Sequence, residues 1–129
     1  MAENLRRSLY AVSVVPIVTG ALTAFLGADS VPAPGDPSPN LESELRFYSV
    51  WWIGAGVFLA WLAPRVEERT LELRVFCALL FFSGVSRGLA ALATDWPSTG
   101  QIILMGLELV LPVILVTWQA RVLARLHHA

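Results

Sequence analysis

Four long apolar stretches dominate the sequence, and shorter polar segments separate them. They cover residues 9–28, 45–62, 75–94 and 101–120. A helix rises 1.5 Å per residue, so a stretch of about 18–20 residues matches the roughly 30 Å hydrocarbon core of a bilayer. The helices of soluble bundles keep a polar face, and the strands of membrane barrels alternate in polarity. These stretches show neither feature, so the pattern predicts four membrane-spanning helices.

With their flanking residues, the predicted helices cover about 9–28, 39–62, 73–94 and 101–122 of a single domain, residues 1–129. Ser38 followed by Pro39 is typical of an N-cap and a first helical position, so we expect the second helix to begin there. The proline-rich segment 31–39 that precedes it predicts an extended connection.

The arginines predict how these helices are oriented. All nine basic residues of the chain are Arg, and seven of them fall on one side of the predicted membrane: Arg6, Arg7, Arg65, Arg69, Arg74, Arg121 and Arg125. Short segments rich in arginine stay in the cytoplasm. We therefore expect an all-α integral membrane protein, an antiparallel bundle of four transmembrane helices with both chain ends on the cytoplasmic side.

Composition narrows the function classes. The hydrophobic fraction is 56%, above the 45–50% or so of soluble domains, and the net charge of −1 gives no reason to expect a nucleic-acid partner. Cys77 is the only cysteine, and the two histidines are the adjacent His127 and His128 at the chain end. This set predicts no metal site and no cofactor, because structural metal sites need three or four converging ligands.

Two ionisable residues lie inside the third and fourth apolar stretches. Arg87 lies eight residues before Asp95, and Glu108 lies seven residues after Gln101, so both are about 10–12 Å from the connection between their helices. A charged residue at a helix centre costs about 2.5–3.5 kcal/mol. We therefore expect Arg87 to pair with Glu108. The pair is either a lock between two helices or part of a site for a headgroup, quinone or ion.

A second polar group begins the predicted second helix. Glu42 and Arg46 are four residues apart and share a helix face, with Glu44 between them. These residues either form a solvated turn at the membrane surface, or Arg46 points inward and joins Arg87 and Glu108. Such an outward-facing pocket would suit an anionic headgroup or a carboxylate. The candidate ligand-binding residues are Arg46, Arg87, Glu108, Glu42 and Glu44, and none is predicted to be catalytic.

Small residues four apart indicate where helices pack closely. Gly84 with Gly88 forms a GxxxG motif, and Gly20 with Ala24 and Gly56 with Ala60 repeat the spacing. Such pairs allow two helix backbones to approach in a membrane. We expect them to serve packing within the chain rather than dimerisation.

Three segments together carry a family resemblance. They are residues 40–48 with the sequence NLESELRFY, residues 83–87 with the sequence SGVSR, and Glu108 followed by Pro112. The chain resembles the domain-of-unknown-function 4345 family of small bacterial four-helix membrane proteins from residue 10 to 121. The resemblance implies the topology above and a place in the bacterial inner membrane, and it supplies no activity.

These observations favour a non-enzymatic accessory or lipid- or quinone-binding subunit, which contacts membrane lipids and other subunits of a larger membrane complex. The alternative is a small oligomeric proton-coupled transporter that uses Glu108. A partner such as Arg87 would oppose proton uptake by that carboxylate. A lipid-modifying enzyme with Glu42 or Glu44 as base is a third possibility, for which the sequence shows no nucleophile.

The predicted orientation is testable with reporter fusions. A reporter that is active only outside the cytoplasm should be active when fused after Pro34 and silent when fused after Glu68, because the arginines flank the second site. The reverse pattern of activities would overturn the orientation.

Overall fold

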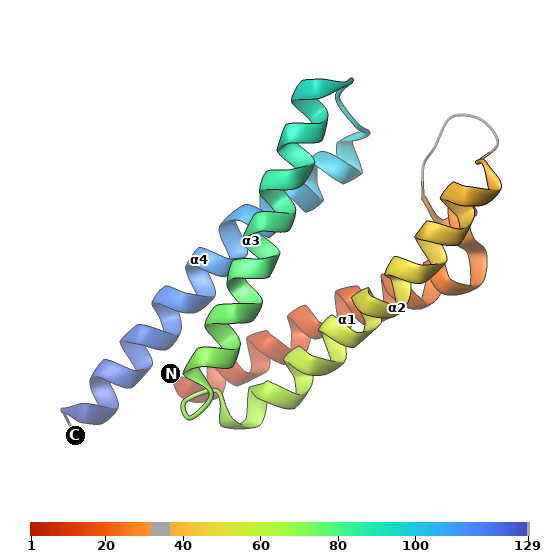
Figure 1. Cartoon of the computed structure of the whole chain (residues 1–129). Helices are drawn as coiled ribbons and strands as arrows, with labels where there is room; N and C mark the ends of the chain where they lie inside the picture. The colour runs from red at the N-terminus through yellow and green to blue at the C-terminus, as the bar shows by residue number, and fades with distance from the viewer. Residues whose placement is uncertain (32–36, 129) are drawn as a thin grey trace. The chain divides into compact units, whose positions relative to one another are not determined.

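The computed structural model describes residues 1–31 and 37–128. In chain order the elements are α1 (Ala2–Leu26), the 3₁₀ helix η1 (Gly27–Ser30), α2 (Pro39–Leu62), the 3₁₀ helix η2 (Ala63–Arg65), α3 (Thr70–Ala93) and α4 (Thr99–His127) (Figure 1). The described residues form no strand, and all four α-helices are long and apolar enough to span a membrane. Within the segment that we predict to be extended, residues 32–36 lie outside the described part of the chain.

The helix ends follow from local chemistry. The side chain of Ser38 caps α2 by accepting a hydrogen bond from the Leu41 amide at 3.2 Å, and Pro39 is the first helical residue. Helix α1 begins at Ala2 rather than at residue 9, and α4 continues to His127 rather than to residue 122. Both extensions carry charged or ionisable residues, which interrupt the apolar stretches, but acidic residues in a first turn and basic ones in a last turn stabilise helix ends.

The chain divides into two compact units, which we describe separately. The α1–α2 unit contains residues 6–64, and the α3–α4 unit contains residues 1–5 and 65–129. In each unit, two helices of opposite direction lie against each other.

Glycines bring the helices of the α1–α2 unit together. A Cβ atom placed on Gly20 would lie 2.7 Å from Ile53 Cγ1 and 2.9 Å from the Ser49 carbonyl oxygen. One placed on Gly56 would lie 2.7 Å from the Ser13 carbonyl oxygen. Backbone atoms thus occupy the space that a larger residue would need, as the small-residue spacing predicts for packing inside the chain.

The α3–α4 unit shows a close contact at Gly84, in this case with side-chain atoms. A Cβ atom there would lie 2.9 Å from Leu109 Cγ and 3.0 Å from Glu108 Cβ. At the other end of this helix pair, the buried Gln119 donates a hydrogen bond from Nε2 to the Val66 carbonyl oxygen at 2.6 Å. This bond ties the segment before α3 to the second half of α4.

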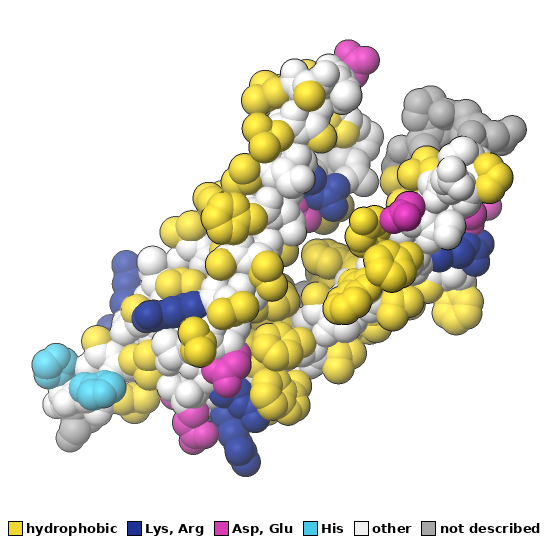
Figure 2. Space-filling view, viewed as in Figure 1, with side chains coloured by type: hydrophobic (Ala, Val, Ile, Leu, Met, Phe, Trp, Pro, Cys, Tyr) yellow, Lys and Arg dark blue, Asp and Glu magenta, His cyan; other side chains and the backbone are white. Residues whose placement is uncertain are grey.

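The outer faces of the helices are apolar. Phe25 is 82% exposed, Leu92 75% and Leu71 72%, and at most 28% of the residues in each apolar window are buried. Figure 2 shows hydrophobic side chains over much of the visible helix surface. Water would disfavour so much exposed apolar area, whereas lipid tails would not. The fold fits a multi-pass membrane protein.

The glycine contacts give a test with an internal control. Gly56→Ala should lower the stability of the purified protein by about 1–3 kcal/mol, because the new methyl group overlaps the backbone of α1. Gly54→Ala should leave stability unchanged or raise it, since no atom lies within 4 Å of its Cβ position. The measurement is thermal unfolding in detergent. Equal effects of the two substitutions would contradict the packing of α1 against α2.

Candidate functional site

The structure brings Arg87 of α3 and Glu108 of α4 together, as their spacing predicts. Arg87 Nε lies 3.1 Å from Glu108 Oε1 and 2.9 Å from Oε2, so both carboxylate oxygens accept from one nitrogen. Only 6% of the Glu108 side chain is exposed, against 42% for Arg87. The acid is therefore the buried member of the pair, and the guanidinium reaches the surface.

Gln101 is a third member of this group that the sequence analysis did not identify. Its Oε1 accepts a hydrogen bond from Arg87 Nη1 at 2.6 Å. Gln101 stands at the start of α4, two turns before Glu108, and a separation of seven residues places both on one face. The seven-residue spacing is the sequence feature that could have identified Gln101. The bond draws the guanidinium along the helix pair toward the connection between α3 and α4, as long arginine side chains do near a membrane surface.

The three side chains leave hydrogen-bonding capacity unused. An arginine has five N–H donors. Within the described part of the chain, Arg87 donates through Nε and Nη1, and no bond from Nη2 is present. Glu108 neutralises the charge of Arg87. The group therefore presents N–H donors at an exposed edge without a net positive charge.

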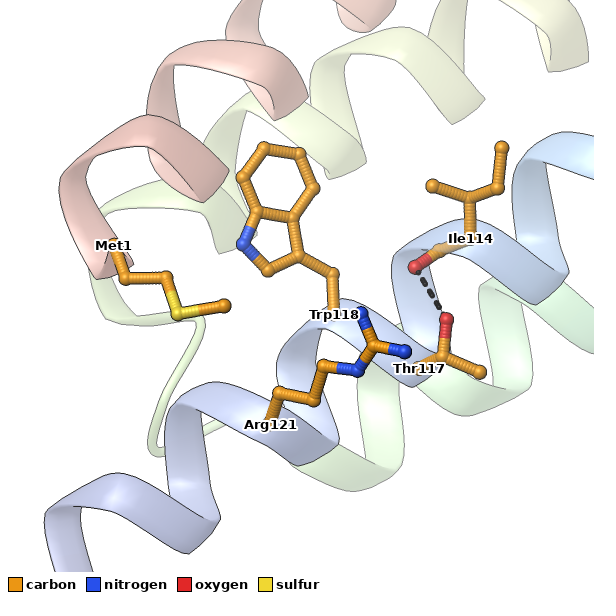
Figure 3. A pocket seen from close by; sticks show the side chains of 5 residues that line it. All are labelled: Met1, Ile114, Thr117, Trp118 and Arg121. Carbon is orange, nitrogen blue, oxygen red and sulfur yellow. Dashed lines mark hydrogen bonds between the residues drawn. The ribbon is translucent and has the colours of Figure 1, made fainter.

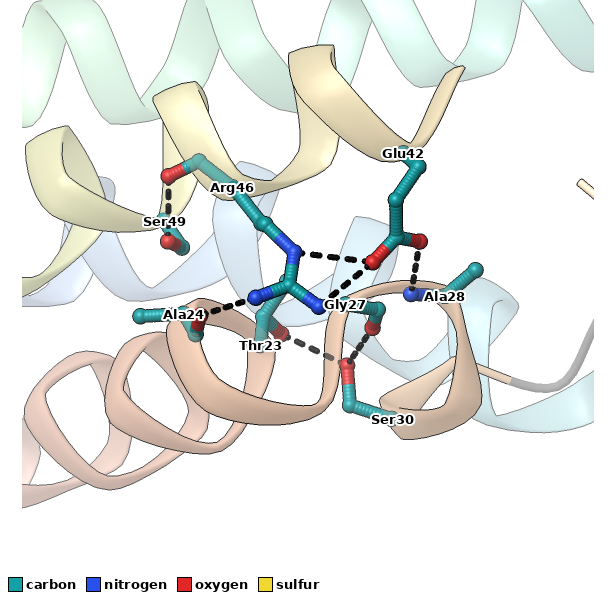
Figure 4. A network of polar contacts seen from close by, with 8 residues as sticks. All are labelled: Thr23, Ala24, Gly27, Ala28, Ser30, Glu42, Arg46 and Ser49. Atoms are coloured by element: carbon teal, nitrogen blue, oxygen red, sulfur yellow. Dashed lines mark hydrogen bonds and ion pairs between the residues drawn. The ribbon is translucent and has the colours of Figure 1, made fainter. Parts of the chain in front are cut away.

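Glu42 and Arg46 form a second polar group, in the α1–α2 unit (Figure 4). Arg46 Nη2 lies 2.7 Å from Glu42 Oε1, and Nε donates to the same oxygen at 2.8 Å. Each partner also binds the backbone where α1 ends: Arg46 Nη1 donates to the Ala24 carbonyl oxygen at 3.2 Å, and the Ala28 amide donates to Glu42 Oε2 at 2.9 Å. The pair therefore clamps α2 to the end of α1.

Gly27 makes room for this clamp. It adopts a φ of +58°, the left-handed conformation that favours glycine after a helix. A Cβ atom there would collide with the Glu42 carboxylate. Beside it, the Ser30 hydroxyl donates to the Gly27 carbonyl oxygen at 2.7 Å and lies 2.8 Å from the Thr23 hydroxyl. Glu42 and Arg46, which belong to the segment 40–48 of the family resemblance, thus satisfy polar backbone groups at a helix end.

The remaining candidate, Glu44, is exposed on α2 and has no hydrogen bond or ion pair with the residues that the structure describes. Arg46 lies in the α1–α2 unit, and Arg87 and Glu108 lie in the α3–α4 unit. A shared pocket of the two arginines therefore stays a hypothesis.

A groove in the α3–α4 unit is a further feature that the sequence analysis missed. It encloses about 320 Å³ and is lined by Met1, Ile114, Thr117, Trp118 and Arg121 (Figure 3). Four of these residues lie on α4, and positions 117, 118 and 121 follow position 114 by three, four and seven residues, so the four share one face of the helix. That spacing, with an arginine and a tryptophan at one end of an apolar stretch, is the sequence feature that could have indicated the groove.

Comparison with known proteins identifies one relationship. The model of the domain-of-unknown-function family DUF4345 matches residues 5–119, which is most of the chain. No curated protein and no solved structure matches it. The matched range contains both polar groups, the glycine contacts and the apolar stretches of all four α-helices. The chain belongs to the DUF4345 family.

Proposed function

We propose that this protein is a non-enzymatic accessory subunit of the bacterial inner membrane, which holds the oxygen-rich head of a lipid or quinone at Arg87. One observation carries the proposal. A guanidinium that is fixed by two partners keeps 42% of its side-chain surface exposed on an apolar helix pair.

The position of Arg87 suits such a ligand. Arg87 lies six residues before the end of α3 at Ala93, which is about 9 Å of helix. Its bond to Gln101 turns the guanidinium toward that end. Phosphate and ester oxygens of lipids, or the carbonyl oxygens of a quinone head, lie within the reach of such a side chain, and all of them accept hydrogen bonds.

The engagement of the carboxylates favours binding over proton transport or catalysis. Both oxygens of Glu108 accept hydrogen bonds from Arg87, so this carboxylate is engaged within the protein. Glu42, which an enzymatic mechanism would need as a base, accepts from Arg46 and from the Ala28 amide. We therefore place proton-coupled transport second and assign no catalytic residue.

The accessory role rests on the helix surfaces. Large apolar side chains are exposed along all four helices, for example Val14, Trp51, Leu79 and Ile103. Surfaces of this kind contact either lipid tails or the helices of neighbouring subunits. Pull-down from native membranes followed by mass spectrometry would show whether other subunits are bound.

Co-purification tests the ligand directly. Protein purified gently from its native membrane should retain a lipid or quinone, identified by mass spectrometry of the extract. The double variant Arg87→Leu with Glu108→Leu should lose it, because two leucines keep the helices packed and remove the donors. Gln101→Leu is the matched single change, since it leaves the ion pair intact, and it should weaken retention only partly.

Retention of the same ligand by the double variant would contradict the proposal. In proteoliposomes, the wild-type protein should not dissipate a proton gradient. Substrate-dependent proton flux that disappears in Glu108→Gln would instead support the transporter.

A further inference from the structure

Arg121 of α4 is a cation with no counter-ion among the described residues. It is exposed, and it makes no hydrogen bond or ion pair with any residue that the structure describes. It lines the groove of about 320 Å³ and lies one turn after Thr117. A cationic side chain at the edge of a groove of this size suits an anionic ligand.

The rest of the groove is suited to hydrocarbon. Ile114, Met1 and the indole of Trp118 supply apolar surface (Figure 3). The Thr117 hydroxyl lies 2.8 Å from the Val113 carbonyl oxygen and 3.0 Å from that of Ile114, so its hydrogen is committed to the helix backbone. Among the side chains that line the groove, the donors left are the Arg121 guanidinium and the indole N–H of Trp118, which has no acceptor among the described residues.

The groove also lies at the arginine-rich end of its unit. The bond between Gln119 and Val66 places the second half of α4 beside the start of α3. This end therefore carries five arginines of the unit, together with four glutamates, Glu3, Glu67, Glu68 and Glu72; the arginines are Arg65, Arg69, Arg74, Arg121 and Arg125. The arginine distribution predicts that this end faces the cytoplasm, where anionic lipids attract basic segments.

We propose that this groove is a binding site for an anionic phospholipid of the cytoplasmic leaflet. The Arg121 guanidinium binds the headgroup phosphate, and one acyl chain lies along Trp118 and Ile114. A cation next to an apolar surface matches the two halves of such a lipid, whereas a soluble anion would gain nothing from the apolar wall. The site is independent of Arg87 and of the function proposed for it.

Native mass spectrometry of the protein from nanodiscs tests the assignment. The discs contain equal amounts of anionic phosphatidylglycerol and zwitterionic phosphatidylcholine. Wild-type protein should retain phosphatidylglycerol preferentially, and Arg121→Gln should weaken that retention about tenfold, the loss expected for one hydrogen bond to a charged group. Arg125→Gln is the matched control, because it removes the same charge one turn later on α4, outside the groove.

The control separates a site from general attraction. A small loss with Arg125→Gln and a large one with Arg121→Gln supports the groove, and equal losses overturn it, since charge alone would then explain the binding. A wild-type protein without preference for phosphatidylglycerol overturns it as well. The same spectra report oligomers, and a dimer that depends on Arg121 but not on the lipid would assign the groove to a second copy of the chain.

Discussion

A carboxylate in an apolar helix must have a partner, and this constraint organises the α3–α4 unit. Glu108 is buried in α4, where an uncompensated charge would be costly. Because Gly84 has no side chain, α4 comes so close that a Cβ atom placed on Gly84 would lie 3.0 Å from Glu108 Cβ. Arg87 follows on the same face of α3 three residues later. The glycine sets the distance between the helices, and the arginine supplies the charge. Together they fix the register of one helix against the other.

The α1–α2 unit solves a related problem for backbone groups. A helix end leaves carbonyl and amide groups without partners, and a hydrocarbon environment makes these expensive. Here Arg46 serves the Ala24 carbonyl and Glu42 serves the Ala28 amide. Both units use the same arrangement: two opposite charges neutralise each other, and the pair also makes hydrogen bonds to other polar groups. The units differ in one respect: every nitrogen of the Arg46 guanidinium contacts a partner, whereas Arg87 Nη2 makes no hydrogen bond with the described residues.

The sequence predicted those features that depend on spacing along the chain. Four apolar stretches predicted four helices, Ser38 and Pro39 predicted where α2 begins, and matched distances from a short connection predicted the contact of Arg87 with Glu108. Helix extensions that carry charged residues were missed, since hydropathy measures apolar length and not helix length.

Features that depend on the course of the backbone could not be predicted in this way. The clamp joins Arg46 to a carbonyl 22 residues away, and it requires α1 to end before a left-handed Gly27. The groove around Arg121 arises where side chains of one helix face and the first residue of the chain meet. The sequence shows the residues of both features but not their convergence.

A double-mutant cycle on Arg87 and Glu108 tests the coupling on which this account depends. Arg87→Leu strands a buried acid and should cost about 3–5 kcal/mol of stability. Glu108→Leu should cost less, because the half-exposed arginine can extend toward the membrane surface. The double variant should recover most of the loss, since leucines remove both charges from the apolar interior. Unfolding in detergent of the four proteins would measure this coupling, and additive losses would contradict it.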